Sequence, residues 1–126
     1  MSWLAVAGGG ALGSMARHAV NLLFAHVLER AVPYATAAVN LLGSATIGLL
    51  AALIATGRVH MSVELRTFVF VGILGGFTTF SSFMLDTFTL GHGGEHALAF
   101  WNVALQTGLG LAFVWAGYRA GLLIAN

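Results

Sequence analysis

Apolar residues dominate the chain, and only three short polar segments interrupt them. The four apolar stretches run from about Trp3 to Leu28, Tyr34 to Thr56, Arg66 to Leu90 and Ala97 to Leu123. Each is long enough for a helix that crosses a bilayer, which needs about 20 residues. The pattern therefore predicts an all-α membrane protein, in which residues 1–126 form a single domain of four transmembrane helices.

The connecting segments are short and carry most of the charged residues, in the sequences ERAVP, TGRVHMSVELR and GHGGEH. Short connections make neighbouring helices antiparallel, so both termini are expected on the same side of the membrane. The arginine bias is weak, because Arg58, Arg66 and Arg119 lie on the side of the termini and Arg30 lies on the other. Two topologies stay open: cytoplasmic termini, or copies that insert both ways.

Composition supports the membrane assignment. The chain is 59% hydrophobic and 7% charged, whereas about a quarter of the residues in soluble domains are charged. A net charge of +1 gives no basis for nucleic-acid binding, and the absence of cysteine excludes disulfides and thiolate sites. The N-terminus lacks the basic region of a cleaved signal peptide, and its apolar run extends to Arg17.

Small residues recur at the spacing of helix contacts, as at Gly9 and Gly13 and at Gly43 and Gly48. Glycine lets membrane helices approach closely, so these positions are expected at helix–helix contacts. Four helices make a thin bundle, and a single copy has little room to hide all of its polar residues. A homo-oligomer is therefore expected.

Two sets of polar residues lie within the predicted spans. Thr36, Asn40 and Ser44 share one face of the second helix, and Asn102 and Gln106 share one face of the fourth. A buried amide without partners costs about 2–7 kcal/mol, so each of these amides must find hydrogen bonds. Two roles stay open: hydrogen bonds that hold helices together, or polar groups along an ion path.

An arginine and an aspartate also lie within the spans. Arg17 is at mid-helix, where insertion costs about 2.5–3.5 kcal/mol, so it must pair, reach the interface or face water. Asp86, late in the third helix, is a candidate partner for a structural ion pair. The alternative is a water-filled vestibule lined by Arg17, which would attract anions.

The segment LGGFTTFSSF, from Leu74 to Phe83, predicts a break in the third helix. Each glycine inside a helix costs about 1 kcal/mol, and two occur together at Gly75 and Gly76. Unwound backbone at membrane depth is tolerated where it is buried in protein or lines a cavity, and its freed groups can bind ions. The alternative is a glycine notch for helix packing beside ordinary core aromatics.

His92, Glu95 and His96 match the spacing of the zinc motif H-x-x-E-H. That motif needs a helix, and two glycines in a short connection disfavour one, so a solvated loop is expected. No acid–base pair or nucleophile in the sequence suggests catalysis, and no phosphate-binding loop suggests an energised pump. The chain is therefore not expected to be an enzyme.

Three motifs, in order along the chain, resemble those of the Fluc/CrcB family of fluoride ion channels. GGGALGSMARH, which contains Arg17, is similar to the glycine motif of the family's first helix. ATAAVNLLGS, around Asn40, is similar to its second-helix motif. GGFTTFSSF, from Gly75 to Phe83, resembles its most specific signature. The resemblance extends over nearly the whole chain.

The resemblance implies a passive, fluoride-selective channel that exports cytoplasmic fluoride and lowers its toxicity. The family forms antiparallel, dual-topology homodimers of multi-pass subunits in the cell (inner) membrane, with two narrow fluoride pathways. Fluoride, the lipid bilayer and a second copy of the chain are thus the implied partners. Copies inserted in both orientations would also account for the weak arginine bias.

The resemblance also implies which residues meet the ion. Asn40 would be an amide donor, and Phe80 and Phe83 would present ring edges to the fluoride. The remaining pathway positions carry hydroxyl or amide groups: Thr36, Thr79, Ser82, Asn102 and Gln106.

The resemblance gives the helix break and the arginine separate roles. The unwound Gly75–Thr78 part would bind a structural sodium ion at the dimer interface, through the main-chain carbonyls of Gly75 and Thr78. Arg17 would line an aqueous vestibule. The family often has serines in the fourth helix, where this chain has Gln106 and Gly110.

Two functions of other kinds stay open. The first is a proton-coupled, dual-topology exporter of small molecules, which needs a membrane-embedded carboxylate that titrates. Asp86 is the acidic residue within the predicted spans that would serve it. The second is a non-transporting structural subunit of a larger membrane complex.

Overall fold

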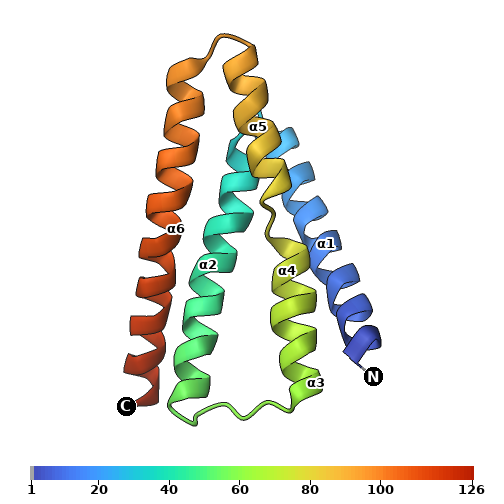
Figure 1. Ribbon diagram of the computed structural model, residues 1–126, viewed down its shortest axis with the longest axis vertical. Helices are drawn as coiled ribbons and strands as arrows, with labels where there is room; N and C mark the ends of the chain where they lie inside the picture. The colour runs from blue at the N-terminus through green and yellow to red at the C-terminus, as the bar shows by residue number, and fades with distance from the viewer. Residues whose placement is uncertain (1) are drawn as a thin grey trace.

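The computed structural model describes residues 2–126 as helices joined by short loops. The helical segments run alternately up and down, so the two termini lie at the same end of the molecule (Figure 1). This confirms the predicted antiparallel order. The elements are α1 (Ser2–Val27), α2 (Tyr34–Ala55), α3 (Val63–Arg66), η1 (Thr67–Leu74), α4 (Gly75–Phe77), α5 (Ser81–His92) and α6 (His96–Ala125).

Within residues 2–126, three segments are long and apolar enough to cross a membrane: Tyr34–Ala55, Val63–His92 and His96–Ala125. The second of these combines α3, the π-helical η1 and α4 with α5, which follows a break. α1 has 26 residues, but its glycines and the polar residues around Arg17 make it less apolar than the other segments. That α1 crosses the membrane stays a prediction.

Local sequence explains where several helices begin and end. α2 ends before Gly57, which has a φ of 72°, a conformation that favours glycine. α3 begins after Ser62, whose hydroxyl accepts the Leu65 N–H at 3.1 Å. Gly94, with a φ of 85°, turns the chain between α5 and α6.

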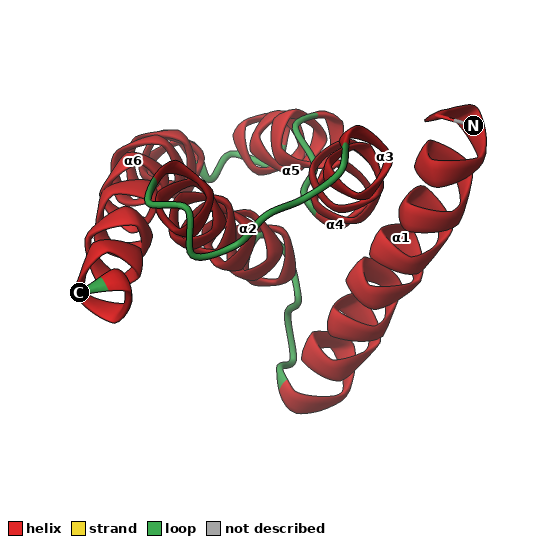
Figure 2. Cartoon of the chain, turned by 90° about the horizontal axis from the view of Figure 1, so that it is seen from below, coloured by secondary structure: helices red, strands yellow, loops and turns green. Residues whose placement is uncertain are grey.

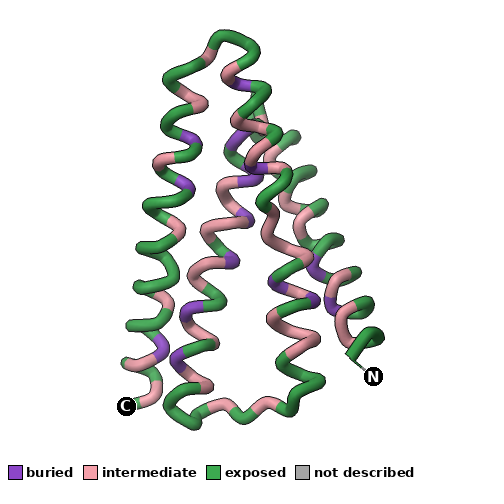
Figure 3. The backbone as a smooth tube through the Cα atoms, viewed as in Figure 1, coloured by how far each residue is buried: buried purple, intermediate pink, exposed green. Residues whose placement is uncertain are grey.

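The helices form packed pairs rather than a closed bundle. α1 packs on η1 and α4, α2 packs along α6, and α5 contacts the first part of α6. α1 and α6 lie on opposite sides of the molecule (Figures 1 and 2). Buried residues are therefore few, and much of the apolar surface is exposed (Figure 3). Lipid or another protein chain must cover that surface.

Glycine makes the helix contacts close, as its spacing predicted. A Cβ on Gly9 or Gly13 would collide with carbonyl oxygens of η1, and one on Gly48 would collide with the Val114 carbonyl of α6. The main chains of neighbouring helices can approach this closely only where side chains are absent.

The break in the third helix is present but lies later than predicted. Gly75 and Gly76 stay helical within α4, and the chain leaves the helix at Thr78, where ψ is 162°. The predicted unwinding is therefore wrong for the two glycines. Gly76 serves packing instead, since a Cβ there would lie 2.7 Å from the Gly10 carbonyl oxygen of α1. The helical hydrogen bonds of α4 and this contact outweigh the low helix propensity of glycine.

An ion pair joins the two loops at the end opposite the termini, and it is the only one within residues 2–126. Arg30 and Glu95 share two hydrogen bonds, one of them 2.7 Å from Nη1 to Oε2. The bond from Arg30, helped by its charge, lowers the pKa of Glu95, and the same bond raises the pKa of Arg30. Both side chains are exposed, so the pair contributes little to stability.

Alanine at Gly13 and at Gly10 should have opposite effects on stability. Gly13→Ala forces α1 away from η1 and should destabilise the fold by about 1–3 kcal/mol, the usual cost of overpacking. A Cβ on Gly10 meets no atom within 4 Å, so Gly10→Ala should stabilise α1 by up to about 1 kcal/mol. Thermal unfolding in detergent measures both shifts. Equal shifts would contradict the packing role of Gly13.

The Arg30–Glu95 pair predicts a small pH dependence of stability. Because the folded pKa of Glu95 is lowered, the pair stabilises the fold above the ordinary glutamate pKa and loses this effect as pH falls through the lowered value. The difference in melting temperature between wild type and Glu95→Gln should therefore shrink from about pH 7 to about pH 3. Glu64→Gln is the matched control. An undiminished difference in acid would rule out the carboxylate as its source.

Candidate functional site

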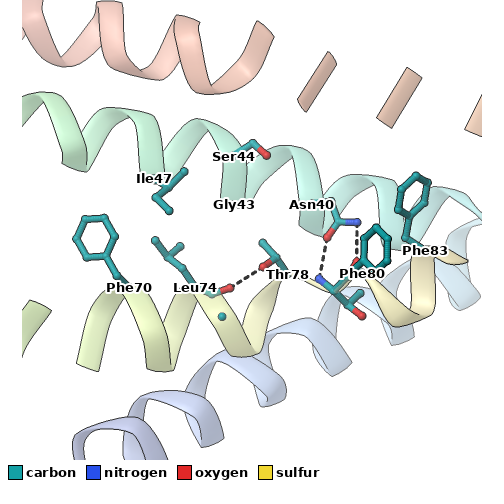
Figure 4. A pocket seen from close by; sticks show the side chains of 11 residues that line it. Asn40, Gly43, Ser44, Ile47, Phe70, Leu74, Thr78, Phe80 and Phe83 are labelled. Carbon is teal, nitrogen blue, oxygen red and sulfur yellow. Dashed lines mark hydrogen bonds between the residues drawn. The ribbon is translucent and has the colours of Figure 1, made fainter. Parts of the chain in front are cut away.

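A single asparagine pairs the main chain at the helix break. Asn40, on α2, accepts the Thr79 N–H with its Oδ1 at 2.8 Å and donates to the Thr79 carbonyl with its Nδ2 at 3.0 Å. Figure 4 shows this side chain reaching across to the break. The amide replaces the partners that Thr79 would have in a continuous helix. Unpaired main-chain groups at membrane depth cost several kcal/mol each, so Asn40 stabilises the break.

Asn40 also begins a chain of side-chain hydrogen bonds that connects three helices. Its Nδ2 donates to Gln106 Oε1 at 2.9 Å, and Gln106 Nε2 donates to Asn102 Oδ1 at 2.8 Å, both on α6. Asn102 Nδ2 donates to Thr87 Oγ1 of α5 at 2.9 Å, and the Thr87 hydroxyl donates to the Phe83 carbonyl at 2.8 Å. These four side chains are called the amide relay below: Asn40, Gln106, Asn102 and Thr87.

The amide relay joins the polar positions predicted on the second and fourth helices. Asn102 and Gln106 are only 5% and 7% exposed, so both amides are buried within a single chain. Thr107, beside them in the sequence, is exposed. The two amides, four residues apart, lie on the side of α6 that contacts α2 and α5.

The break borders a cavity of about 500 Å³ between α2 and the third helical segment. Asn40, Ser44, Phe80 and Phe83 are among the residues that line it (Figure 4). The two rings meet edge to face, with centroids 6.1 Å apart and planes at 78°. Phe80 is 73% exposed and Phe83 is 8% exposed. An amide and two aromatic rings therefore border one cavity, although they come from two different helices.

A second cavity, of about 300 Å³, contains Arg17, Thr36 and Asp86 in its lining. The Thr36 hydroxyl donates to Asp86 Oδ2 at 2.6 Å. Arg17 donates to the Thr78 carbonyl at 3.3 Å rather than to Asp86. The predicted Arg17–Asp86 ion pair is therefore wrong, because the break offers the guanidinium a main-chain acceptor. The carboxylate accepts the Thr36 hydroxyl instead.

The break divides the polar face that the sequence predicted on α2. Asn40 and Ser44 line the first cavity, whereas Thr36 lines the second together with Ser82. Thr79 lines both cavities, and its hydroxyl accepts the Ser82 N–H at 3.2 Å at the start of α5. One face of α2 therefore serves two cavities, with Thr79 at their boundary.

The predicted cation ligands lie at the edge of the first cavity, which both Gly75 and Thr78 line. In a continuous helix the Thr79 N–H would donate to the Gly75 carbonyl, but it donates to Asn40 instead. The Thr78 carbonyl accepts the hydrogen bond from Arg17. Main-chain oxygens at a helix break are suited to a cation such as sodium. Residues 2–126 contain no cluster of three or more His, Cys, Asp or Glu side chains that could hold a metal.

Thr87 and Phe70 are among the residues of the site that sequence reasoning missed. Thr87 ends the amide relay, and Phe70 of η1 lines the first cavity. Thr87 lies four residues after Phe83, so a hydroxyl on the same helix face was an available signal. Phe70 gives no such signal, because it is one phenylalanine within an apolar run.

Comparison with known proteins covers nearly the whole chain. The family described as "CrcB-like protein, Camphor Resistance (CrcB)" matches residues 4–118. The "Fluoride-specific ion channel FluC" of Paramagnetospirillum magneticum is 42% identical over 125 residues, which cover 98% of each chain. The protein of the same name from Rhodospirillum rubrum is 42% identical over 125 residues, 98% of this chain and 97% of that one. The one from Paracoccus denitrificans is 48% identical over 121 residues, covering 95% and 94%.

Proposed function

The chain belongs to the CrcB family, and we propose that it is a passive, fluoride-selective ion channel that exports fluoride from the cytoplasm and lowers its toxicity. The names of its relatives support fluoride as the ion. One observation within the molecule carries the proposal: Asn40, which holds the helix break, lines the same cavity as Phe80 and Phe83. A channel passes its ion without changing any covalent bond, so the chain is not an enzyme.

The chemistry of this cavity suits a small, strongly hydrated anion. Fluoride loses its water only where hydrogen-bond donors replace it, and Asn40 brings an amide to the cavity. The edge of a phenyl ring carries partial positive charge, so Phe80 and Phe83 hold the ion weakly. Conduction needs binding that admits the ion and still releases it. The pathway continues along polar side chains that border the two cavities or belong to the relay: Thr36, Thr79, Ser82, Asn102 and Gln106.

We also propose that the channel is an antiparallel, dual-topology homodimer in the cell (inner) membrane. Phe80 is 73% exposed on a single chain, although it lines the cavity with Asn40. A partner copy would cover this ring and the break beside it. Two copies in opposite orientations supply the inverted symmetry that many transporters build from internal repeats, and the weak arginine bias agrees with this arrangement.

The carbonyls of Gly75 and Thr78 are the proposed ligands of a structural sodium ion at the dimer interface. The Thr79 N–H, which would be the helical donor to the Gly75 carbonyl, donates to Asn40 instead. Gly75 and Thr78 both line the first cavity. When bound, sodium would supply the positive charge that fixes these main-chain oxygens. Arg17 is proposed to line an aqueous vestibule, since it borders the second cavity.

Sodium should stabilise the assembled protein. A ligand that binds only the folded dimer raises its stability by mass action. Exchange of sodium for N-methylglucamine should therefore lower the melting temperature of the purified protein, and added sodium should restore it. Potassium, added at the same ionic strength, is the control. A melting temperature that does not depend on sodium would contradict the site.

Fluoride efflux from liposomes tests the channel itself. Fluoride-loaded vesicles that contain the wild-type protein should show electrogenic efflux without a proton gradient. Asn40→Leu removes a donor to a charged ion and should slow efflux about 10- to 100-fold. Phe80→Ile removes the ring edge and should slow it as well. Well-folded wild-type protein without efflux would overturn the proposal.

The same vesicles separate the channel from a proton-coupled exporter. An exporter of that kind needs a carboxylate that gains and loses a proton, and Asp86 is the acidic residue of the second cavity. Asp86→Asn should abolish transport by such an exporter and should leave fluoride efflux in place. Loss of all efflux in this variant, with its fold intact, would favour the exporter.

A further inference from the structure

The orientation of every amide in the relay follows from one main-chain group. The Thr79 N–H can only donate, so the Asn40 atom that faces it is the oxygen, and Nδ2 is left to face Gln106. Gln106 then presents Oε1 to Asn40 and Nε2 to Asn102, and Asn102 presents Nδ2 to Thr87. All donors therefore point the same way along the relay, which ends on a main-chain carbonyl of α5.

In this state Asn40 has no hydrogen to give to an ion. Its Nδ2 carries two hydrogens, and they go to the Thr79 carbonyl and to Gln106 Oε1. An anion at this point would also meet the Gln106 oxygen, whose lone pairs repel it. These hydrogen bonds therefore prevent Asn40 from donating to fluoride, which is the role proposed for it.

The relay can reverse its direction from Gln106 to Thr87 and keep the two bonds that join Gln106, Asn102 and Thr87. A half-turn of the Gln106 amide exchanges its oxygen and nitrogen with little change of shape. Asn102 then turns likewise and donates to Gln106 Oε1, and the Thr87 hydroxyl turns from the Phe83 carbonyl to Asn102 Oδ1. The Phe83 carbonyl lies within α5 and keeps its helical donor. Only two hydrogens lose their acceptors, one on Asn40 Nδ2 and one on Gln106 Nε2.

We propose that fluoride binds between Asn40 Nδ2 and Gln106 Nε2, and that its binding reverses the relay as far as Thr87. Asn40 itself does not turn, because the Thr79 N–H requires its oxygen. After the reversal, two N–H groups face each other across the site. Two bonds to the ion replace the Asn40–Gln106 bond and the bond from Thr87 to the main chain, so the number of hydrogen bonds is unchanged. The inference rests on the proposed function.

The site favours the smallest halide. Asn40 Nδ2 and Gln106 Oε1 are only 2.9 Å apart, so the two amides must separate to admit an ion. Asn40 is held by two bonds to Thr79, and Gln106 is 7% exposed within close packing. Resistance to separation grows with the radius of the ion, because protein interiors yield little.

Side-chain amide NMR of the ¹⁵N-labelled protein in lipid nanodiscs tests the reversal. Fluoride should shift the resonances of Asn40, Gln106 and Asn102 with one apparent dissociation constant. Asn102 is the decisive residue, because the ion does not touch it and only the reversal alters its bonds. A response confined to Asn40 and Gln106 would overturn the coupling.

Gln106→Met tests the site, because it keeps the length of the side chain and removes the donor. Fluoride should bind about 10- to 100-fold more weakly, the range expected for a lost hydrogen bond to an ion. Gln106→Met alone leaves the buried Asn102 oxygen without its donor. The double variant Gln106→Met with Asn102→Leu removes that oxygen and should show the same loss of fluoride affinity. Thr107→Val, at the exposed neighbour, should bind fluoride like the wild type.

Whether Gln106→Met binds fluoride more weakly or more tightly separates this inference from simple competition. If Gln106 only competes with fluoride for the Asn40 hydrogen, Gln106→Met would bind fluoride more tightly, and this result would overturn the shared site. Unchanged binding in Gln106→Met would overturn it too. Wild-type vesicles that release no fluoride would instead overturn the proposed function.

Discussion

A break in a membrane helix leaves main-chain groups without partners, and hydrocarbon offers no water to replace them. In this chain, Asn40 supplies partners for both the N–H and the carbonyl of Thr79. The same amide brings α2 to the break and holds Gln106 of α6. The break, the first cavity and the amide relay therefore depend on one side chain. Arg17 adds a donor for the Thr78 carbonyl.

Glycine brings the helices close enough for these bonds to form. Gly43, one turn after Asn40, leaves room for the methyl group of Thr78, and a Cβ there would collide with it. Gly76 lets α4 lie against α1 in the same way. Close approach of main chains gives many van der Waals contacts without a loss of side-chain entropy. A larger residue at Gly43 would move α2 away from the break and stretch the bonds of Asn40.

Particular residues show where sequence reasoning succeeded and where it failed. Helix length and apolar pattern placed the helical segments within a few residues, because both depend on local composition. The glycine pair was assigned to the break by its propensity, yet Gly75 and Gly76 stay helical. Propensity is a weak local term, and contact with α1 overrides it. The Arg17–Asp86 pair failed for a related reason, since the preferred acceptor was a carbonyl that only the break exposes.

The sequence by itself determined that the chain is a helical membrane protein with a broken third segment, amides within its spans and a family resemblance. These features rest on composition, spacing and motif order, which are properties of the chain alone. The tertiary structure alone decided that Asn40 meets Thr79, that Asn102 and Gln106 continue to Thr87, and that one polar face of α2 serves two cavities. Partners of this kind lie 15–66 residues apart along the chain. No periodicity within a helix carries information about a neighbour on another helix, and only packing brings the two together.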